Sequence, residues 1–411
     1  MSPPPPPPSP RLPRPLEGIR VLDFTRVLAG PLATALLADL GAEVVKVEPP
    51  QGDDYRHIGP MRAGCSALFT VMNRGKKSLV LDLRQSAAQA LARDLAATAD
   101  VVVENFRPGV AERLGIGAAA MRAENPRLVY VSVSGFGQTG PLAHRPAYDI
   151  IVQAMSGLME ATGEPDGAPT LVGEAVSDVV AGLFASWAIL AALLQAQRSG
   201  QGQEVDVAMF DTTLAFLATS MARYLFTDQP ARRVGNRHPL SAPFGVYRAA
   251  DGHFALAVLN KKLFDQLADA MGQPALAQDV RFATDETRSA HEPALRAAIE
   301  AWAGTLDVAT VVAQLEAAGV PAAPIWNIAQ ALASPQAQAR GLLQPVDDPR
   351  LPNLRLPRQP VQFSASAPCA PTRAPTLGEH TEQLLGTLLG LQRTRLDELR
   401  ALGIFGNQET A

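Results

Sequence analysis

The sequence predicts an α/β fold: a Rossmann-like, mostly parallel sheet in a large domain, together with a smaller α+β domain. In the first half of the chain, short β-branched segments alternate with helix-periodic ones, a pattern typical of covered parallel sheets. Beyond residue 227 the pattern changes to turns, prolines and paired strands followed by amphipathic helices. The chain has 411 residues, of which 47% are apolar and 18% charged, so it is long enough to fill two cores.

The elements of the large domain are expected in a regular order. The predicted strands are 19–25, 43–49, 77–83, 100–106 and 127–137, and the predicted helices between them are 32–42, 86–99 and 111–125. Ligands of open parallel sheets bind at the carboxyl ends of the strands. We therefore expect a ligand site at the turns that follow Phe24, Val47, Leu81, Val103 and Val133.

Four segments are predicted along the chain. Residues 1–15 are proline-rich and lack the apolar stretch of a signal peptide, so we expect a disordered tail. Residues 16–227 should form the first part of the large domain, and residues 228–330 the small α+β domain. Residues 331–411 begin proline-rich and end helical, and we expect them to return to the large domain.

Charge, cysteine content and missing motifs exclude several classes of protein. A net charge of −4 argues against nucleic-acid binding. The two cysteines, Cys65 and Cys369, lie far apart, which fits a reducing cytoplasm and predicts neither a disulfide framework nor a metal site. No GxGxxG follows the first strand, and no Walker loop or GxSxG occurs. We expect no permanently bound cofactor.

One helix carries a single charge in an otherwise apolar stretch. Residues 174–198 contain only Asp178 between their charged ends, which predicts a buried core helix. Polar and small residues dilute the stretch, so no membrane span is expected. Asp178 lies near the helix start, where an acid either stabilises the helix or serves chemistry. The neighbouring Gly173 and Gly182 remove bulk, which favours space for a substrate.

Three further motifs each allow a structural and a functional interpretation. VENFRPG (103–109) is either a capped turn or, with Arg107 and Arg113, a pair of cations for phosphates. SVSGFGQTGP (132–141) is either a plain loop or a turn whose backbone N–H groups approach a ligand. NRGKKSLVLDLR (73–84) is typical of a solvated basic edge.

Taken in order, these motifs resemble the class III CoA-transferases, the CaiB/BaiF family that includes formyl-CoA and carnitine-CoA transferases. The matching stretches begin with LEGIRVLDFTRVLAGP (16–31) and include AYDIIVQAMSGLM (147–159), AVSDVVAGLFA (175–185) and GQGQEVDVAMFD (200–211). They end with APTLGEHT (374–381), so the resemblance covers nearly the whole chain. Within the family, the sequence is most similar to succinyl-CoA-dependent dicarboxylate CoA-transferases.

The resemblance implies a mechanism, substrates and site residues. Asp178, in a motif completed by Gly182, would be the nucleophile that forms an aspartyl anhydride and an aspartyl-CoA thioester. The substrates would be an acyl-CoA, with succinyl-CoA as the donor, and a dicarboxylic acid acceptor, handled by an interlocked homodimer without nucleic acid or membrane. The implied CoA-binding residues are Val27, Leu28, Ala29, Asp82, Leu83, Arg84, Asn105, Phe106, Arg107, Arg113 and Ser134.

Some positions depart from the pattern of related branches, and alternatives remain. Leu28 replaces a Gln of the formyl-CoA enzymes, and Tyr148 replaces the catalytic His of 2-methylacyl-CoA racemases. A racemase on the same fold and a catalytically silent CoA-binding protein are the alternative hypotheses. Arg237 or His238, in the segment 235–247, would pair with the distal carboxylate of a dicarboxylic acid; a structural turn with surface charges fits these residues equally.

Overall fold

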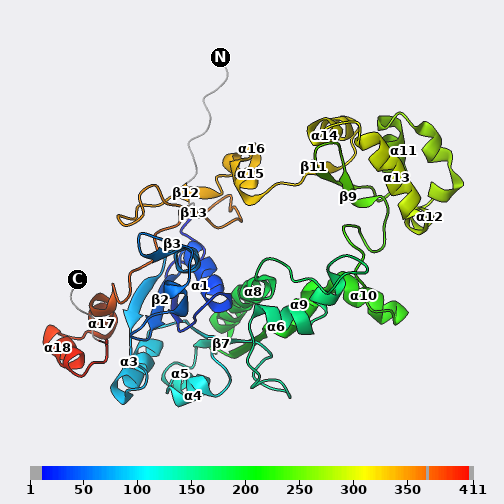
Figure 1. Ribbon diagram of the computed structural model, residues 1–411. Coiled ribbons are helices and arrows are strands. Elements are labelled where there is room, and N and C mark those ends of the chain that lie inside the picture. Colours follow the sequence, from blue (N-terminus) through cyan, green and yellow to red (C-terminus); the bar gives the residue numbers. More distant parts are fainter. Residues whose placement is uncertain (1–11, 367–369, 407–411) are drawn as a thin grey trace. The chain divides into compact units, whose positions relative to one another are not determined.

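The structure, a computed structural model, describes residues 12–366 and 370–406. The chain forms two compact units (Figure 1). Unit 1 contains the residues up to 158, 172–221 and the chain from 338 onward, and unit 2 contains 159–171 and 222–337. The segment 159–171 belongs to unit 2, whereas the sequence placed it in the large domain.

Unit 1 is built on a six-stranded parallel sheet in the order β5-β2-β1-β6-β7-β8. All five predicted strands are present, and a sixth short strand follows the apolar helix. The strand order reverses between β1 and β6, which is where ligands of such sheets bind. The strands are β1 (Arg20–Asp23), β2 (Glu43–Glu48), β5 (Lys77–Val80), β6 (Val101–Glu104), β7 (Val129–Ser134) and β8 (Glu204–Ala208).

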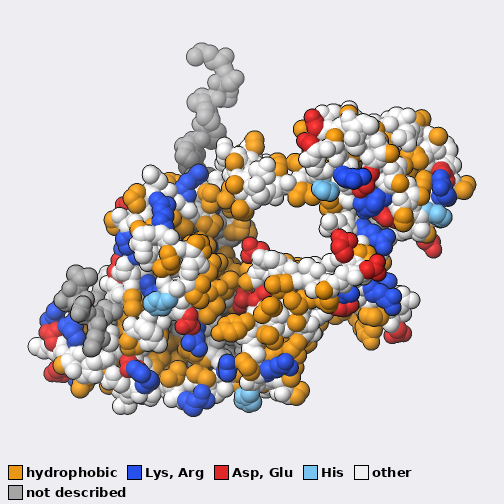
Figure 2. Space-filling model, in the orientation of Figure 1, with side chains coloured by type: hydrophobic (Ala, Val, Ile, Leu, Met, Phe, Trp, Pro, Cys, Tyr) orange, Lys and Arg blue, Asp and Glu red, His pale blue; other side chains and the backbone are white. Residues whose placement is uncertain are grey.

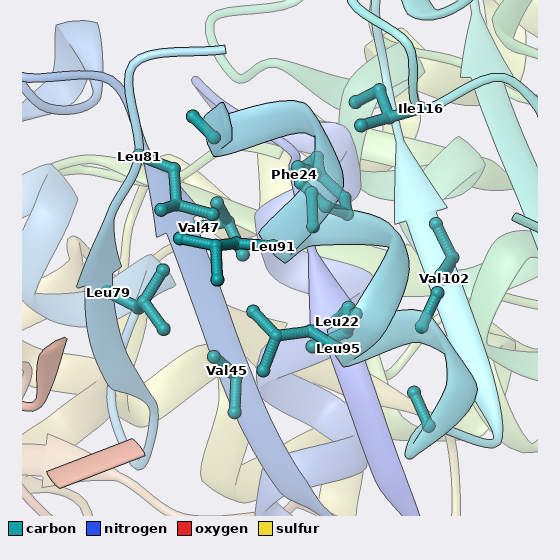
Figure 3. Close-up of a cluster of buried hydrophobic side chains, with 14 of the residues drawn as sticks. Leu22, Phe24, Val45, Val47, Leu79, Leu81, Leu91, Leu95, Val102 and Ile116 are labelled. Atoms are coloured by element: carbon teal, nitrogen blue, oxygen red, sulfur yellow. The ribbon is translucent and has the colours of Figure 1, made fainter. Parts of the chain in front are cut away.

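Two buried clusters, one for each face of the sheet, form the core of unit 1. On one face, Leu22, Val45 and Val102 interdigitate with side chains of α3 (Figure 3). The C-terminal residues from Leu384 to Phe405 add to the same cluster, so the predicted return to the large domain is observed. The helices of this face are α3 (Ser86–Ala97), α5 (Ala118–Glu124), α17 (Thr381–Leu389) and α18 (Arg393–Ala401), with α4 (Val110–Arg113) beside α5.

The other face is covered by α1 (Ala29–Asp39), α6 (Asp149–Met155), α8 (Val176–Ser199) and α9 (Met209–Phe216). The predicted helix 111–125 is interrupted, because Gly115 adopts a left-handed φ of 69° that ends α4 before α5 begins.

The smaller elements are β3 (Met61–Arg62), β4 (Cys65–Ser66), α2 (Ala67–Met72), α7 (Leu158–Ala161), α10 (Ala218–Thr227), α16 (Pro335–Ala339), β12 (Leu343–Pro345) and β13 (Arg355–Pro357), with the 3₁₀ helix η1 (Asp54–His57).

Helix α8 is not the fully buried helix that its composition predicts. One face packs on α1, α9 and the sheet, but the opposite face is open in the single chain. Figure 2 shows hydrophobic side chains gathered over α6, α8 and α9. By length and composition α8 would also pass as a membrane span, although 44% of its most apolar stretch is buried in the fold. The exposed large apolar residues of α8 are Leu183, Phe184, Trp187, Leu190 and Leu194.

The prediction that residues 1–15 form a disordered tail is wrong at the end of this segment. Residues 1–11 lie outside the described residues. Leu12, however, donates its backbone N–H to the carbonyl of Ala365 at 3.0 Å and forms a bridge with Ser366. The chain from Leu12 onward is therefore attached to the segment that returns near the C-terminus.

Unit 2 is an α+β fold with its own core. Its antiparallel sheet has the order β11-β10-β9, and Phe254, Phe264 and Leu315 are fully buried between the sheet and the helices. The elements are β9 (Phe244–Arg248), β10 (His253–Ala257), α11 (Lys261–Ala270), α12 (Asp285–Ala290), α13 (Glu292–Ala303), α14 (Val308–Ala317), β11 (Ala322–Pro324) and α15 (Ile328–Ala333), with the 3₁₀ helices η2 (Pro274–Gln278) and η3 (Val280–Phe282).

Candidate active site

A cavity of about 240 Å³ opens at the carboxyl ends of the strands of unit 1. Asp178 forms part of its wall, together with the turns after β1, β6 and β7. This is the edge at which the sequence predicted a ligand site. Of the predicted site residues, the cavity brings together Val27, Leu28, Ala29, Asn105, Phe106, Arg107, Ser134 and Asp178.

Asp178 lies where the first turns of two helices meet. It occupies the first turn of α8, and the backbone N–H of Ala29, the first residue of α1, hydrogen-bonds its carboxylate. One turn further along α8, a Cβ at Gly182 would lie 2.8 Å from the carbonyl oxygen of Ala29. Gly182 therefore allows α1 to approach α8 closely. The prediction that Gly182 leaves space for a substrate is wrong, because the backbone of α1 fills that space.

Burial raises the pKa of Asp178 to about 7, and the nearby Asp149 carboxylate adds to the increase, while the Ala29 N–H opposes it. No cation of the described residues lies within ion-pair distance of Asp178. An acid with a pKa near the operating pH is available both as an anion and as an acid, which is typical of functional sites.

Asp149 holds the start of α8. Its Oδ1 accepts the backbone N–H of Ser177 at 2.8 Å, and its Oδ2 accepts from Gln153 Nε2 at 2.7 Å. Since Ala175, the residue before α8, makes no side-chain cap, Asp149 performs this capping from α6. Asp149 thus both fixes the helix that carries Asp178 and places a second negative charge beside it.

Tyr55 is a further neighbour of the two carboxylates. Burial raises the pKa of its phenol, and the charges of Asp178, Asp53 and Asp149 raise it further. Neither Tyr55 nor Asp149 was predicted as a site residue. A capping function such as that of Asp149 acts across elements that are distant in sequence, so only the folded arrangement reveals it.

Side chains from other segments hold the turn from β1 to α1 at Arg26 and Val27. Val27 has a φ of 69°, an unfavourable conformation for a β-branched residue that costs on the order of 1–3 kcal/mol. Asn105 clamps the backbone of Arg26: its Oδ1 accepts the N–H at 2.9 Å, and its Nδ2 donates to the carbonyl at 2.8 Å. Both polar atoms of the Asn105 amide, a predicted CoA contact, therefore hydrogen-bond this turn and position it.

Ser134 presents an unpaired polar group to the cavity. Its side chain is buried, and its Oγ has no hydrogen-bond partner among the described residues. Buried hydroxyls are nearly always paired, so an unpaired one at a cavity wall indicates a partner supplied by a ligand.

A second cavity of about 290 Å³ contains three of the other four predicted CoA residues. Asp82, Leu83 and Arg84 line it, and Asp82 accepts from the Arg84 guanidinium at 2.8 Å through both oxygens. The two cavities share Arg26, Asp54 and Phe106 as lining residues, so they adjoin. Together they provide a path suited to a long ligand with two different ends.

Cations line these cavities unevenly. Arg107 and Arg145 line the Asp178 cavity, and no carboxylate of the described residues lies within ion-pair distance of either. Arg145 was not predicted from the sequence. Arg113 lines neither cavity, and its guanidinium donates to the carbonyl of Gly109 at 3.0 Å. Among the described residues, no group of three or more acidic, His or Cys side chains is arranged to hold a metal.

The two predicted substrate residues lie in unit 2. Arg237 and His238 line a largely apolar cavity of about 640 Å³, and neither is part of the wall around Asp178. Arg237 faces Glu292 at 3.7 Å, while His238 stacks on Phe244 with ring centroids 4.8 Å apart. The backbone N–H of Leu240 lies 3.2 Å from His238 Nδ1, which accepts it.

The fold is that of a CoA-transferase. The model of CoA-transferase family III matches residues 16–381. The chain therefore belongs to CoA-transferase family III, as the sequence predicted, and it is an enzyme whose substrates are CoA thioesters.

Curated relatives and a solved structure agree with this assignment. The chain is 42% identical to succinate–glutarate CoA-transferase of Agrobacterium fabrum, over 92% of this chain and 97% of the relative. It is 46% identical to acetyl-CoA:oxalate CoA-transferase of Acetobacter aceti, over 80% and 85%. The crystal structure of a CaiB/BaiF family protein from Brucella suis is similar with a TM-score of 0.81 and 39% identity, covering 92% of this chain and all of that one.

Proposed function

We propose that this enzyme transfers CoA from succinyl-CoA to a dicarboxylic acid, with Asp178 as the nucleophile. The observation that carries the proposal is the state of Asp178: a carboxylate at a cavity wall, without a cation, with a pKa raised to about 7 by burial. An unpaired, poorly solvated carboxylate is a better nucleophile than one held in an ion pair. The names of the relatives support the substrate class, since one acts on glutarate and another on oxalate.

Four acyl transfers complete the proposed reaction. The Asp178 carboxylate attacks the thioester carbonyl of the donor, which forms a mixed anhydride and releases the CoA thiolate. The thiolate attacks the aspartyl carbonyl, which forms an aspartyl-CoA thioester and releases the donor acid. The acceptor carboxylate then attacks this thioester and again releases CoA thiolate. Attack of that thiolate on the acceptor's carbonyl yields the new acyl-CoA and regenerates Asp178.

The surroundings of Asp178 suit these intermediates. Anhydrides and thioesters hydrolyse, so a site with little water preserves the activated acyl group. The N–H of Ala29 fixes the orientation of the attacking carboxylate. The backbone N–H groups of Leu28 and Gly135, both at the cavity wall, are candidate donors to the oxyanion of the thioester.

CoA is proposed to extend through both cavities of unit 1. Its thioester end would lie beside Asp178, where the unpaired Ser134 hydroxyl can bind it. The remainder would pass Phe106 toward Asp82, Leu83 and Arg84. Arg107, an exposed cation without a carboxylate partner among the described residues, would bind a phosphate. Arg113 remains a proposed CoA contact because it hydrogen-bonds Gly109, which lies in the same turn as Arg107.

The second carboxylate of the acid requires a cation. Arg237 and His238 remain the candidates that the sequence offered, and they line one cavity of unit 2. Arg145 is an additional candidate because it lines the Asp178 cavity itself. Each of the three residues is replaced in turn, and transfer to a dicarboxylic acid is compared with transfer to the monocarboxylic acid of equal length. Only replacement of the residue that binds the distal carboxylate should abolish the preference for the dicarboxylic acid.

A homodimer is proposed from the open apolar face of α8. Large exposed apolar patches mark interaction surfaces. Since the exposed residues of α8 include Trp187 and Leu183, a second copy of this chain is the proposed occupant, and the family resemblance implies interlocked chains. Light scattering after size exclusion, on the wild type and on Trp187→Glu, tests this assembly. We propose a cytoplasmic enzyme without membrane attachment.

Trapping the enzyme-bound intermediate tests the proposed function. The enzyme is incubated with succinyl-CoA, quenched with hydroxylamine or borohydride, and digested for peptide mass spectrometry. Modification of the peptide that contains Asp178, absent from Asp178→Ala, is the expected result. Modification elsewhere would contradict the assignment. Exchange of the α-proton without an acceptor would favour the racemase alternative, and CoA binding without any adduct would favour the silent protein.

A further inference from the structure

The strained turn at Val27 must be held by its surroundings. A β-branched residue at a φ of 69° persists only where neighbouring groups determine the conformation. The next two residues of the same turn, Leu28 and Ala29, line the cavity together with Asp178, and the Ala29 carbonyl oxygen lies against Gly182 of α8. The group that holds Val27 therefore also sets the position of this turn beside Asp178.

Asp53 is that group. Its Oδ1 accepts the backbone N–H of Val27 at 3.1 Å and that of Tyr55 at 2.9 Å. Val27 lines the Asp178 cavity, and Tyr55 lies close enough to Asp178 for that charge to raise the pKa of its phenol. One carboxylate oxygen thus fixes two backbone segments beside the nucleophile.

Lys46 fixes Asp53 in turn. Its Nζ lies 2.8 Å from Asp53 Oδ2, and both side chains are almost entirely buried. The same ammonium donates to the carbonyl of Thr25 at 2.8 Å, so it holds the beginning of the turn as well. A buried ion pair of this kind has no solvent to replace either partner, and its geometry is correspondingly rigid.

We propose that Asp53, anchored by Lys46, is a positioning residue for CoA transfer: it locks Val27 in the left-handed conformation and thereby holds Leu28 and Ala29 in place beside Asp178. This inference rests on the proposed function of Asp178. A purely structural alternative exists, because Asp53 also caps η1 through the N–H of Tyr55. The two roles differ in one respect: only the positioning role depends on which residue occupies position 27.

Asparagine cannot replace Asp53 in this role. The carboxylate accepts hydrogen bonds or charge on both oxygens, from Val27 and Tyr55 on one and from Lys46 on the other. An amide has a single acceptor, so in either orientation its NH₂ group faces a donor. Asp53→Asn therefore releases either the turn or the ammonium without changing the size of the side chain.

A double-mutant cycle tests the proposal. The kcat and the KM for succinyl-CoA are measured for the wild type, Asp53→Asn, Val27→Gly and the double variant. Glycine adopts positive φ without strain, so it needs no lock. We expect D53N to lower kcat 10- to 100-fold in the wild-type background, with a smaller effect on KM, and to lower it less than threefold in the V27G background. Losses that differ by less than threefold between the two backgrounds would overturn the proposal.

A matched control separates positioning from general destabilisation. Asp39, at the other end of α1, forms an equally buried ion pair with Arg74 at 2.6 Å. Asp39→Asn should lower the melting temperature as D53N does but leave kcat within twofold. A kcat loss in D39N as large as that in D53N would overturn the positioning role.

Two further measurements complete the design. If D53N does not yield folded protein, Lys46→Arg, which keeps the charge but moves it, is measured in the same two backgrounds with the same criterion. Trapping of the Asp178 adduct in the wild type is performed in parallel. An adduct on Asp178 together with background-independent losses means that only the present inference fails, whereas no adduct on Asp178 means that the proposed function fails.

Discussion

Two groups of carboxylates in unit 1, one fully buried and one partly buried, have opposite surroundings. Beneath the turn after β1, Asp53 is paired with Lys46 and Asp23 with Lys76, each at 2.8 Å. Burial opposes ionisation of both acids, yet the lysines keep the pKa of each below its ordinary value. At the start of α8, Asp178 has Asp149 as its charged neighbour instead of a cation, and its pKa rises to about 7.

The paired carboxylates support the backbone of the site, whereas the unpaired Asp178 is the one proposed to attack the substrate. Asp53 and Asp23, whose pKa values are lowered, remain ionised at every physiological pH, and Asp53 holds the backbone at Val27. A carboxylate without a cation stays reactive, because no ion pair must be broken before it attacks a carbonyl. Desolvation opposes ionisation of Asp53, Asp23 and Asp178 alike, so the charge of the neighbour accounts for the opposite directions of their pKa shifts.

Removing the unpaired carboxylate should have the largest effect. We expect Asp178→Asn to lower the transfer rate at least about 1000-fold, because the nucleophile is lost. The raised pKa means that the folded state binds the proton more tightly than the unfolded state, so ionisation of Asp178 costs stability as the pH rises from about 4 to 7. D178N should therefore raise the melting temperature by about 2–6 °C at pH 8, and by less at pH 5. A lower melting temperature at pH 8 would show that Asp178 is stabilised as an anion.

Adding a methyl group where α1 and α8 approach each other closely should have the next largest effect. A Cβ at Gly182 would lie 2.8 Å from the Ala29 carbonyl oxygen and 3.2 Å from a methyl group of Leu32. Gly182→Ala should displace α1, lower kcat 10- to 100-fold and cost about 1–3 kcal/mol of stability. Gly173→Ala is the control, because no heavy atom lies within 4 Å of its added Cβ. Equal kcat values for the two variants would contradict the close crossing.

Neutralising Asp149, the charged neighbour of Asp178, should shift the pH profile of kcat. Since Asp178 attacks as an anion, kcat should fall below about pH 7, approaching tenfold per pH unit. Asp149→Asn keeps an acceptor for the Ser177 N–H, loses the hydrogen bond from Gln153 Nε2 and removes the negative charge, so the pKa of Asp178 should decrease. The acidic limb of kcat should move to lower pH by about half a unit to one unit. An unchanged limb would mean that burial alone sets this pKa.

Replacing an exposed cation should have the smallest effect. Arg107→Ala is expected to raise the KM for succinyl-CoA about 5-fold with little change in kcat, because a phosphate contact contributes to binding rather than to acyl transfer. Exposed charges are screened, so the difference from the wild type should shrink at 0.5 M salt. A salt-independent difference would indicate that Arg107 acts by packing.

The sequence predicted the parallel sheet and the edge at which the cavities open, because strand and helix periodicities are local signals. It also singled out Asp178, whose charge is conspicuous in an apolar helix. It did not reveal that Gly182 admits the backbone of α1, since a close approach depends on the partner helix. The one-sided exposure of α8 was missed because composition alone does not distinguish a core helix from one with an uncovered apolar face.

The supporting residues left no signal in the sequence. Lys46 lies in the strand EVVKVE, where an alternating pattern suggests an exposed side chain, yet it is fully buried. Asp53 lies in a segment that reads as an ordinary turn. Their pairing, and the left-handed Val27 that it holds, arise only when β2 brings the two residues beside the turn after β1.

The most direct test of the contrast between paired and unpaired carboxylates is the pKa of Asp178 itself. Carboxyl ¹³C chemical shifts of enzyme labelled at aspartate Cγ can be followed from pH 5 to 9, and the signal missing from D178N assigns Asp178. The present account predicts one signal that titrates near pH 7, while those of Asp53 and Asp23 stay constant over this range. A fully ionised Asp178 at pH 5 would contradict it.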